Sequence, residues 1–187
     1  MKFLINDKKW PEPGSVPFLE VLQSISNRVE ISDIQTFIEC GTGETGDNAV
    51  HFSKFFDVVT IENNPNLHQR YNLREGAKNA IKWILGDGRT NLKSTLLQHP
   101  NKRFLILLDD HNAHTSFIEQ EMQIIYNCSN RDDHIIIVDD MKFAGRGSYP
   151  TVERLEQLSK QINSDYCIEN TNIGHDIYVI YTKKELK

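Results

Sequence analysis

Five short apolar runs, separated by longer polar stretches, constrain the fold of this 187-residue chain more than any other feature. The runs are IQTFIE at 34–39, VVTIE at 58–62, IKWIL at 81–85, FLILL at 104–108 and HIIIV at 134–138. Strands that are apolar on both faces are typical of a parallel sheet that helices cover on both sides. We therefore predict an α/β fold in which each run forms a parallel strand.

The two ends of the chain depart from this rhythm. Residues 7–17 hold three prolines and a glycine, so we expect an N-terminal arm over 1–16 and a single domain over 17–187. Apolar residues at helical spacing predict helices over 17–29 and 151–163. The two final apolar runs, YCIENT and DIYVIYT, are joined too closely for a parallel crossover and should form an antiparallel hairpin. The expected sheet is Rossmann-like and has seven strands.

Composition argues against several classes of protein. Hydrophobic residues make up 39% of the chain, and no apolar run of about 18 residues predicts membrane insertion. The N-terminus does not resemble a secretory signal, and the three cysteines are scattered, which favours a reducing, cytoplasmic location. A net charge of −5 with dispersed basic residues argues against nucleic-acid binding. A homo-oligomer is compatible with this composition.

The stretch FIECGTGETGDNAV, residues 37–50, contains a glycine motif, with glycines at positions 41, 43 and 46. It follows the first predicted strand, where open α/β sheets bind their ligands. Glycine lets the backbone turn sharply and approach a ligand closely. The motif alone fits a dinucleotide, an adenosyl-methionine or an ordinary strand-to-helix turn.

Acidic residues follow the next two predicted strands. Glu62 ends the second run, where a carboxylate can accept hydrogen bonds from both ribose hydroxyls. Asp87 lies between two glycines after the third run, where an adenine edge could rest. Each acid alone is more often a solvated strand end, but their order favours a nucleoside site.

These residues resemble those of class I methyltransferases that use S-adenosylmethionine, over roughly residues 34–183. The resemblance rests on Glu39-Cys-Gly41-Thr-Gly43, Ile61-Glu62, Gly86-Asp87, Leu108-Asp109 and Val138-Asp139-Asp140. It is nearest to the metal-dependent O-methyltransferases of the catechol and macrocin or sugar types, and to the cephalosporin-hydroxylase-like group. It implies that Glu62 binds the ribose and that the glycine loop, one residue longer here, lies against the methionine part. The implied cofactor-binding residues are Glu39, Gly41, Thr42, Gly43, Asp47, Glu62, Asn63, Asp87, Gly88 and Asp109.

A second set of acids follows the fourth and fifth predicted strands. If these strands are neighbours, Asp109, Asp139 and Asp140 lie close together, and such carboxylates repel unless a cation lies among them. Mg²⁺ or Mn²⁺ suits oxygen ligands of this kind, and the resemblance implies a metal at the same three positions. The alternative is that Asp139 and Asp140 cap the next turn.

Methyl transfer to oxygen also needs a base. His111, two residues after Asp109, is the predicted base, with Asp109 as the next candidate. Catechol-type enzymes have a lysine where Asn112 stands. His111 and His114 would share a face if they lay on a helix, but no third ligand supports zinc. The glycine-containing loop over 142–150 is either mobile, with contacts to the acceptor, or a plain surface loop.

The leading hypothesis is therefore a metal-assisted O-methyltransferase that uses S-adenosylmethionine. A sugar or glycan hydroxyl is favoured over a catechol as the acceptor, because few insertions are available to form an enclosing lid. The alternatives are an NAD-dependent oxidoreductase, which would use the glycine motif differently, and a nucleoside-binding module without catalysis.

Overall fold

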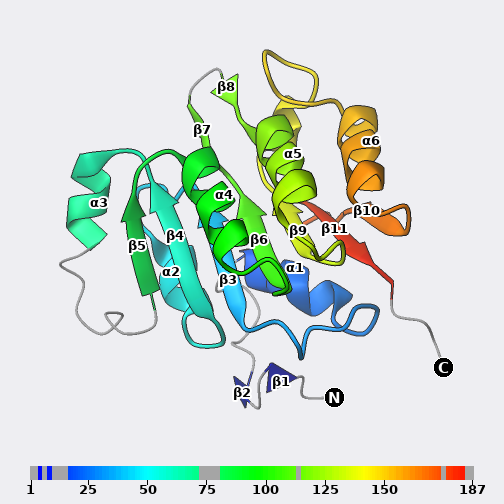
Figure 1. Ribbon diagram of the computed structural model, residues 1–187, viewed down its shortest axis with the longest axis horizontal. Coiled ribbons are helices and arrows are strands. Elements are labelled where there is room, and N and C mark those ends of the chain that lie inside the picture. Colours follow the sequence, from blue (N-terminus) through cyan, green and yellow to red (C-terminus); the bar gives the residue numbers. More distant parts are fainter. Residues whose placement is uncertain are drawn as a thin grey trace.

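The computed structural model describes residues 4–5, 8–9, 17–71, 81–112, 115–173 and 176–183, and has a seven-stranded sheet between two layers of helices (Figure 1). The strands are β3 (Thr36–Cys40), β4 (Asp57–Glu62), β5 (Ile81–Leu85), β6 (Phe104–Leu108), β9 (Ile135–Val138), β10 (Tyr166–Asn170) and β11 (Tyr178–Thr182). They lie in the order β10-β11-β9-β6-β3-β4-β5. β3, β4, β5, β6 and β9 pair in parallel, whereas β11 runs antiparallel to both β9 and β10. The predicted fold class, with its terminal hairpin, is confirmed.

Helices cover both faces of the sheet. The helices are α1 (Pro17–Ile25), α2 (Asp47–Phe52), α3 (Pro65–Tyr71), α4 (Gly88–Gln98), α5 (Ile118–Cys128) and α6 (Val152–Ile162). Residues of α1 and α2 bury one core, in which the rings of Phe37 and Phe52 stack with centroids 4.0 Å apart. Residues of α4, α5 and α6 bury the other core. Two cores on opposite faces explain why the parallel strands are apolar at successive positions.

Helix ends differ from the predictions by a few residues. The first helix was predicted to extend to residue 29 but ends at Ile25, where a turn begins, although Val29 remains buried. The last helix begins at Val152, close to its predicted start, because the Thr151 hydroxyl accepts a hydrogen bond from the Arg154 N–H at 3.1 Å. Such a cap satisfies one of the free N–H groups of the first turn.

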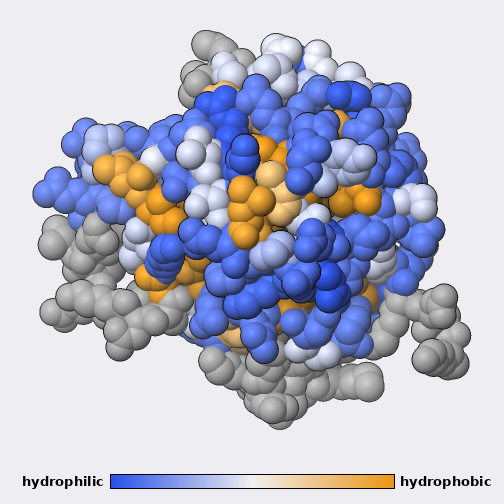
Figure 2. Space-filling model, in the orientation of Figure 1, coloured by the Kyte–Doolittle hydropathy of each residue, from blue (hydrophilic) through white to orange (hydrophobic). Residues whose placement is uncertain are grey.

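Several short elements complete the described chain. β1 (Leu4–Ile5) and β2 (Lys8–Lys9) pair antiparallel within the predicted arm, and β7 (His111–Asn112) pairs with β8 (Thr115–Ser116). A 3₁₀ turn, η1 (Met141–Phe143), follows β9. Polar side chains dominate the face that carries α4, α5 and α6, with apolar side chains in separate groups (Figure 2). Within the described residues, no helix has both the length and the apolar character needed to cross a membrane.

His134, just before β9, is a buried histidine with both ring nitrogens engaged. The Phe104 N–H donates to Nδ1 at 3.1 Å, so Nε2 carries the hydrogen and lies 2.9 Å from the Ser129 hydroxyl. Burial lowers the pKa of His134 to about 4. The ring is therefore neutral in the folded protein at neutral pH.

Acidification is expected to destabilise the protein through His134. Because its folded pKa lies below the unfolded value of about 6.5, the unfolded state binds more protons as pH falls from about 6.5 to about 4. The loss of stability across that window should be about 3 kcal/mol. Urea unfolding at a series of pH values, for wild type and His134→Gln, isolates this contribution from that of the other titrating groups. Parallel stability curves for the two proteins would contradict it.

Candidate functional site

The carboxyl ends of the parallel strands are aligned at one edge of the sheet, because the hydrogen-bond ladder continues one residue beyond each strand. Four backbone N–H groups make these bonds: Gly41 to the Ile61 carbonyl (3.1 Å), Gly86 to Glu62 (2.9 Å), Asp109 to Cys40 (2.9 Å) and Asp139 to Leu108 (3.2 Å). The predicted loops after β3, β5, β6 and β9 therefore begin side by side. This edge is where ligands bind in open α/β sheets.

The glycine loop after β3 has two glycines with different roles. Gly41 has φ +89°, and a Cβ there would lie 2.3 Å from the Asp109 carbonyl oxygen, so the loop packs directly on the end of β6. Gly43 has φ +71°, and a Cβ there would meet no atom within 4 Å. Gly43 thus borders open space in which a ligand can approach the backbone. The helix after this loop, α2, ends at Phe52.

Glu39 is fully buried beneath this loop. The Thr60 hydroxyl donates to Glu39 Oε2 at 2.5 Å, and the Thr42 hydroxyl lies 2.6 Å from that of Thr60. Burial raises the pKa of Glu39 to about 8, although the Thr60 and Asn48 side chains favour its charged form. Its other oxygen, Oε1, is buried without a hydrogen-bond partner. A buried acceptor of this kind usually has a hydrogen-bond partner, so Oε1 has capacity for a further donor group.

The acids after β4 and β5 have different surroundings. Glu62 is buried at the tip of β4, where the Asn64 N–H donates to Oε1 at 2.8 Å and holds the carboxylate in place. Asp87 caps α4 by accepting from the Thr90 N–H at 3.0 Å, and its pairing with Arg89 lowers its pKa. The carboxylate predicted to face an adenine edge is thus also engaged by its own helix.

The remaining predicted cofactor residues lie around the same edge. Asn63 is exposed directly after β4, and Asp47 is exposed at the first position of α2. Gly88 begins α4 with no room for a side chain, because a Cβ there would lie 2.3 Å from Asp110 Oδ2. The hydroxyl of Thr42 turns inward to Thr60.

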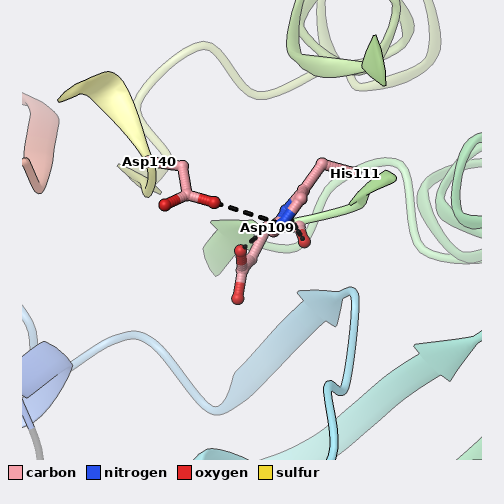
Figure 3. A group of neighbouring side chains, drawn as sticks. All are labelled: Asp109, His111 and Asp140. Atoms are coloured by element: carbon pink, nitrogen blue, oxygen red, sulfur yellow. Dashed lines mark hydrogen bonds and ion pairs between the residues drawn. The ribbon is translucent and has the colours of Figure 1, made fainter. Parts of the chain in front are cut away.

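His111 lies between two carboxylates, one from each of the neighbouring strand ends (Figure 3). Its Nδ1 is 3.3 Å from Asp109 Oδ1, and its Nε2 is 3.2 Å from Asp140 Oδ2. The hydrogen bond to Asp109, aided by the charge of Asp140, raises the pKa of His111 to about 9. His111 lies in β7 rather than on a helix, so it does not have the helical setting considered for a pair with His114, a residue outside the described part of the chain.

Lys142 and Asp176 extend this group of charges, and sequence reasoning gave neither a role in it. The ammonium of Lys142 lies 2.7 Å from Asp140 Oδ1 and 2.8 Å from Asp176 Oδ2. Burial, with the nearby charge of Asp109, raises the pKa of Asp139 to about 7. Asp139 accepts a hydrogen bond from the Asp140 N–H at 2.8 Å. Asp140 precedes η1 but makes no side-chain cap bond, which argues against a capping role for it.

Two groups of three side chains could hold a cation here. Their ligand atoms lie within 4.8 Å of one another, and the groups are Asp109, His111 and Asp140, and Asp139, Asp140 and Asp176. The predicted trio of Asp109, Asp139 and Asp140 does not form one such group among the described residues. Both groups share Asp140, whose two oxygens already contact His111 and Lys142.

The loop over 142–150 is tied down by hydrogen bonds. The Ser116 N–H donates to the Ser148 hydroxyl at 2.7 Å, and that hydroxyl donates to the Ser116 carbonyl at 3.2 Å. Tyr149 is buried, with its ring centroid 6.4 Å from that of His111 and 5.4 Å from that of Phe143. The loop is thus hydrogen-bonded to β8 through Ser148, and Tyr149 packs beside His111.

A second buried acid, Glu121 of α5, was also missed. Both its carboxylate oxygens are buried without partners, and burial raises its pKa well above the ordinary value. It lies close to Cys40 and Asp110, beneath the strand ends. Its position three residues after Ile118 and four before Ile125, on the buried face of α5, is the signal that could have found it.

Comparison with known proteins supports the fold. No protein-family model matches the chain, and no curated protein matches it. A candidate methyltransferase of Escherichia coli is 11% identical, with 97% of this chain and 94% of that one covered and a TM-score of 0.58. A candidate methyltransferase of Streptococcus mutans, in complex with S-adenosylhomocysteine, is 12% identical, with 91% and 99% covered and a TM-score of 0.57. The 1,6-didemethyltoxoflavin-N1-methyltransferase of Burkholderia thailandensis, with bound S-adenosylhomocysteine, is 14% identical, with 88% and 75% covered and a TM-score of 0.54. The chain therefore has the class I methyltransferase fold.

Proposed function

We propose that this chain is an S-adenosylmethionine-dependent methyltransferase that methylates a hydroxyl oxygen. The observation that carries the proposal is the continuous series at one sheet edge: the open space over Gly43, the buried Glu39 and Glu62, and His111 beyond Asp109. Two proteins of similar fold hold S-adenosylhomocysteine. In this chain, Glu62 would accept the ribose hydroxyls and Glu39 Oε1 would accept from a donor group of the methionine part.

The residues of the chain position and deprotonate the acceptor. S-adenosylmethionine supplies an electrophilic methyl group, and the acceptor oxygen must approach it in line. His111 is the best-placed base, because it is partly exposed and Asp109 holds its Nδ1. Loss of the Nε2 proton would free that nitrogen to take the proton of the acceptor hydroxyl, with Asp140 beside it to stabilise the imidazolium that forms. Its pKa of about 9 means that it must first lose a proton, so it acts better as pH rises.

A sugar or glycan hydroxyl is the proposed acceptor, with a catechol-like molecule as the alternative. His111 is 37% exposed, and the half-buried ring of Phe143 packs on the buried Tyr149 near it. Aromatic faces pack well against the apolar faces of sugar rings. Transfer of a labelled methyl group across a panel of sugars, catechols and nucleosides tests this choice.

The two alternative functions, an oxidoreductase and a binding module, would use the same site differently. An NAD-dependent oxidoreductase would use the glycine loop for a pyrophosphate, but β11 runs antiparallel to β9, unlike the all-parallel doubly wound sheet. A binding module would bind the cofactor and transfer nothing.

Calorimetric titration with S-adenosylmethionine, S-adenosylhomocysteine and NADH separates these functions. We expect saturable binding of the first two and none of NADH. Glu62→Gln should weaken S-adenosylmethionine binding about tenfold, because charge-assisted hydrogen bonds are lost. Glu156→Gln, an exposed change on α6, is the matched control and should bind as wild type does. Absence of binding to either sulfur compound would overturn the proposal.

The metal-assisted form of the reaction, with Mg²⁺ or Mn²⁺ at Asp109, Asp139 and Asp140, is the alternative. The two three-residue groups favour it, since carboxylate oxygens suit such ions. The residues do not fit it as they stand, because both oxygens of Asp140 are paired with the cationic side chains of His111 and Lys142, whose charges oppose a further cation.

A further inference from the structure

Two basic side chains of the protein itself are paired with the acids after β6 and β9. His111 lies between Asp109 and Asp140, and Lys142 lies between Asp140 and Asp176. The result is a continuous line of alternating charges from the end of β6 to the residues just before β11.

Asp140 is the centre of this line. Its Oδ2 is 3.2 Å from His111 Nε2, and its Oδ1 is 2.7 Å from Lys142 Nζ. Its backbone N–H donates a hydrogen bond to Asp139 Oδ1 at 2.8 Å. Asp140 also has φ +59°, a conformation that non-glycine residues rarely adopt. The backbone and both oxygens are thus held in one orientation. A divalent ion bound to Asp140 would have to share these oxygens with His111 and Lys142, whose positive charges oppose its binding.

Several contacts hold the ammonium group of Lys142 in position. Its ammonium contacts two carboxylates whose side chains are only 15% and 11% exposed, those of Asp140 and Asp176. Its ammonium also lies 5.2 Å from the centroid of the Phe143 ring. The Met141 N–H donates to the Asp176 carbonyl at 3.0 Å, so the two segments that hold Lys142 are joined by their backbones as well.

We propose that Lys142 is a positioning residue that takes the place of a divalent ion, holding Asp140 against His111 so that methyl transfer proceeds without metal. This inference rests on the proposed methyltransferase function for its activity readout only. Removal of Lys142 leaves Asp176 and Oδ1 of Asp140 without their counter-charge, which opens the group of Asp139, Asp140 and Asp176 to a cation.

The test compares wild type with Lys142→Met, Lys142→Arg and the control Lys160→Met. Lys160 is an exposed lysine of α6 whose ammonium donates to the Ser164 carbonyl, away from the acids. Mn²⁺ binding is followed by electron paramagnetic resonance of the cofactor-free protein. Transfer is measured with S-adenosylmethionine in the presence of EDTA or Mg²⁺.

Wild type and Lys160→Met are expected to show no saturable Mn²⁺ binding up to about 1 mM and equal transfer in EDTA and Mg²⁺. Lys142→Met should gain one Mn²⁺ site, lost again when Asp140→Asn is added, and its transfer should fall about tenfold or more. Lys142→Arg should restore transfer, because it returns the charge.

Stoichiometric Mn²⁺ binding by wild type that Asp140→Asn abolishes would overturn the inference, and this result needs no Lys142 variant to fold. Unchanged transfer in a folded Lys142→Met that binds no Mn²⁺ would overturn it as well. Failure of the proposed function appears separately, as absence of S-adenosylmethionine binding in wild type, and leaves the Mn²⁺ titrations interpretable.

Discussion

Replacing His111 with glutamine is expected to lower kcat for methyl transfer by about 10²–10⁴-fold, the range typical of a lost general base. S-adenosylmethionine binding should change far less than kcat, because the proposed cofactor contacts other than Asp109 lie over β3, β4 and β5, whereas His111 follows β6. Calorimetry and single-turnover transfer on the same preparations measure the two effects. Full kcat in the variant would show that another residue is the base, and Asp109 is the next candidate.

The pH dependence makes this prediction sharper. With a pKa of about 9, the neutral fraction of His111 grows about ninefold from pH 7 to 8 and about fivefold from pH 8 to 9, so wild-type transfer should rise over that range. Stability should follow the opposite course. The folded pKa is raised above the unfolded value of about 6.5, so the contribution of His111 is fully present below 6.5 and is lost as pH rises through about 9. His111→Gln should flatten both profiles.

Much of the fold was predictable because each parallel strand is buried on both faces. In β3, Phe37 belongs to the core under α1 and α2, while Ile38 belongs to the core under α4, α5 and α6. Such a pattern has no polar alternation, and this distinguishes it from a half-exposed strand. Helix ends were less predictable. The end of α2 at Phe52 depends on a turn through residues 53–55 whose sequence carries no proline or glycine.

The strand-end acids were predictable for a related reason. Parallel neighbouring strands end at one edge, so Glu62, Asp109 and Asp139 had to gather there once the strands were assigned. Asp176 could have been found by extending the same reasoning, because an antiparallel strand begins at the edge where its neighbours end. Tyr178, the first residue of β11, pairs with Val138, the last of β9. The contact of Lys142 with Asp140 and Asp176 depends on side-chain directions that no spacing specifies.

Alanine at the two glycines of the loop after β3 is expected to affect different properties: mainly folding stability at Gly41 and mainly S-adenosylmethionine affinity at Gly43. In Gly41→Ala, the new Cβ would lie 2.3 Å from the backbone carbonyl of Asp109, at a φ of +89°. Backbone cannot move aside cheaply, so the variant should lose about 2–5 kcal/mol of stability from overpacking and left-handed strain together. In Gly43→Ala, no atom lies within 4 Å of the new Cβ, so only the strain at φ +71° remains, about 1–2 kcal/mol.

For S-adenosylmethionine affinity, Gly43→Ala is the informative variant. The methyl group of Gly43→Ala projects into the open space assigned to S-adenosylmethionine, and overpacking of about 1–3 kcal/mol corresponds to a loss of roughly 5–150-fold in affinity. Urea unfolding and calorimetric titration of both variants provide the measurements, with Gly145→Ala as a control at another positive φ, +74°, in the loop before α6. If Gly43→Ala bound S-adenosylmethionine as tightly as Gly145→Ala, the space over Gly43 would not be the cofactor site.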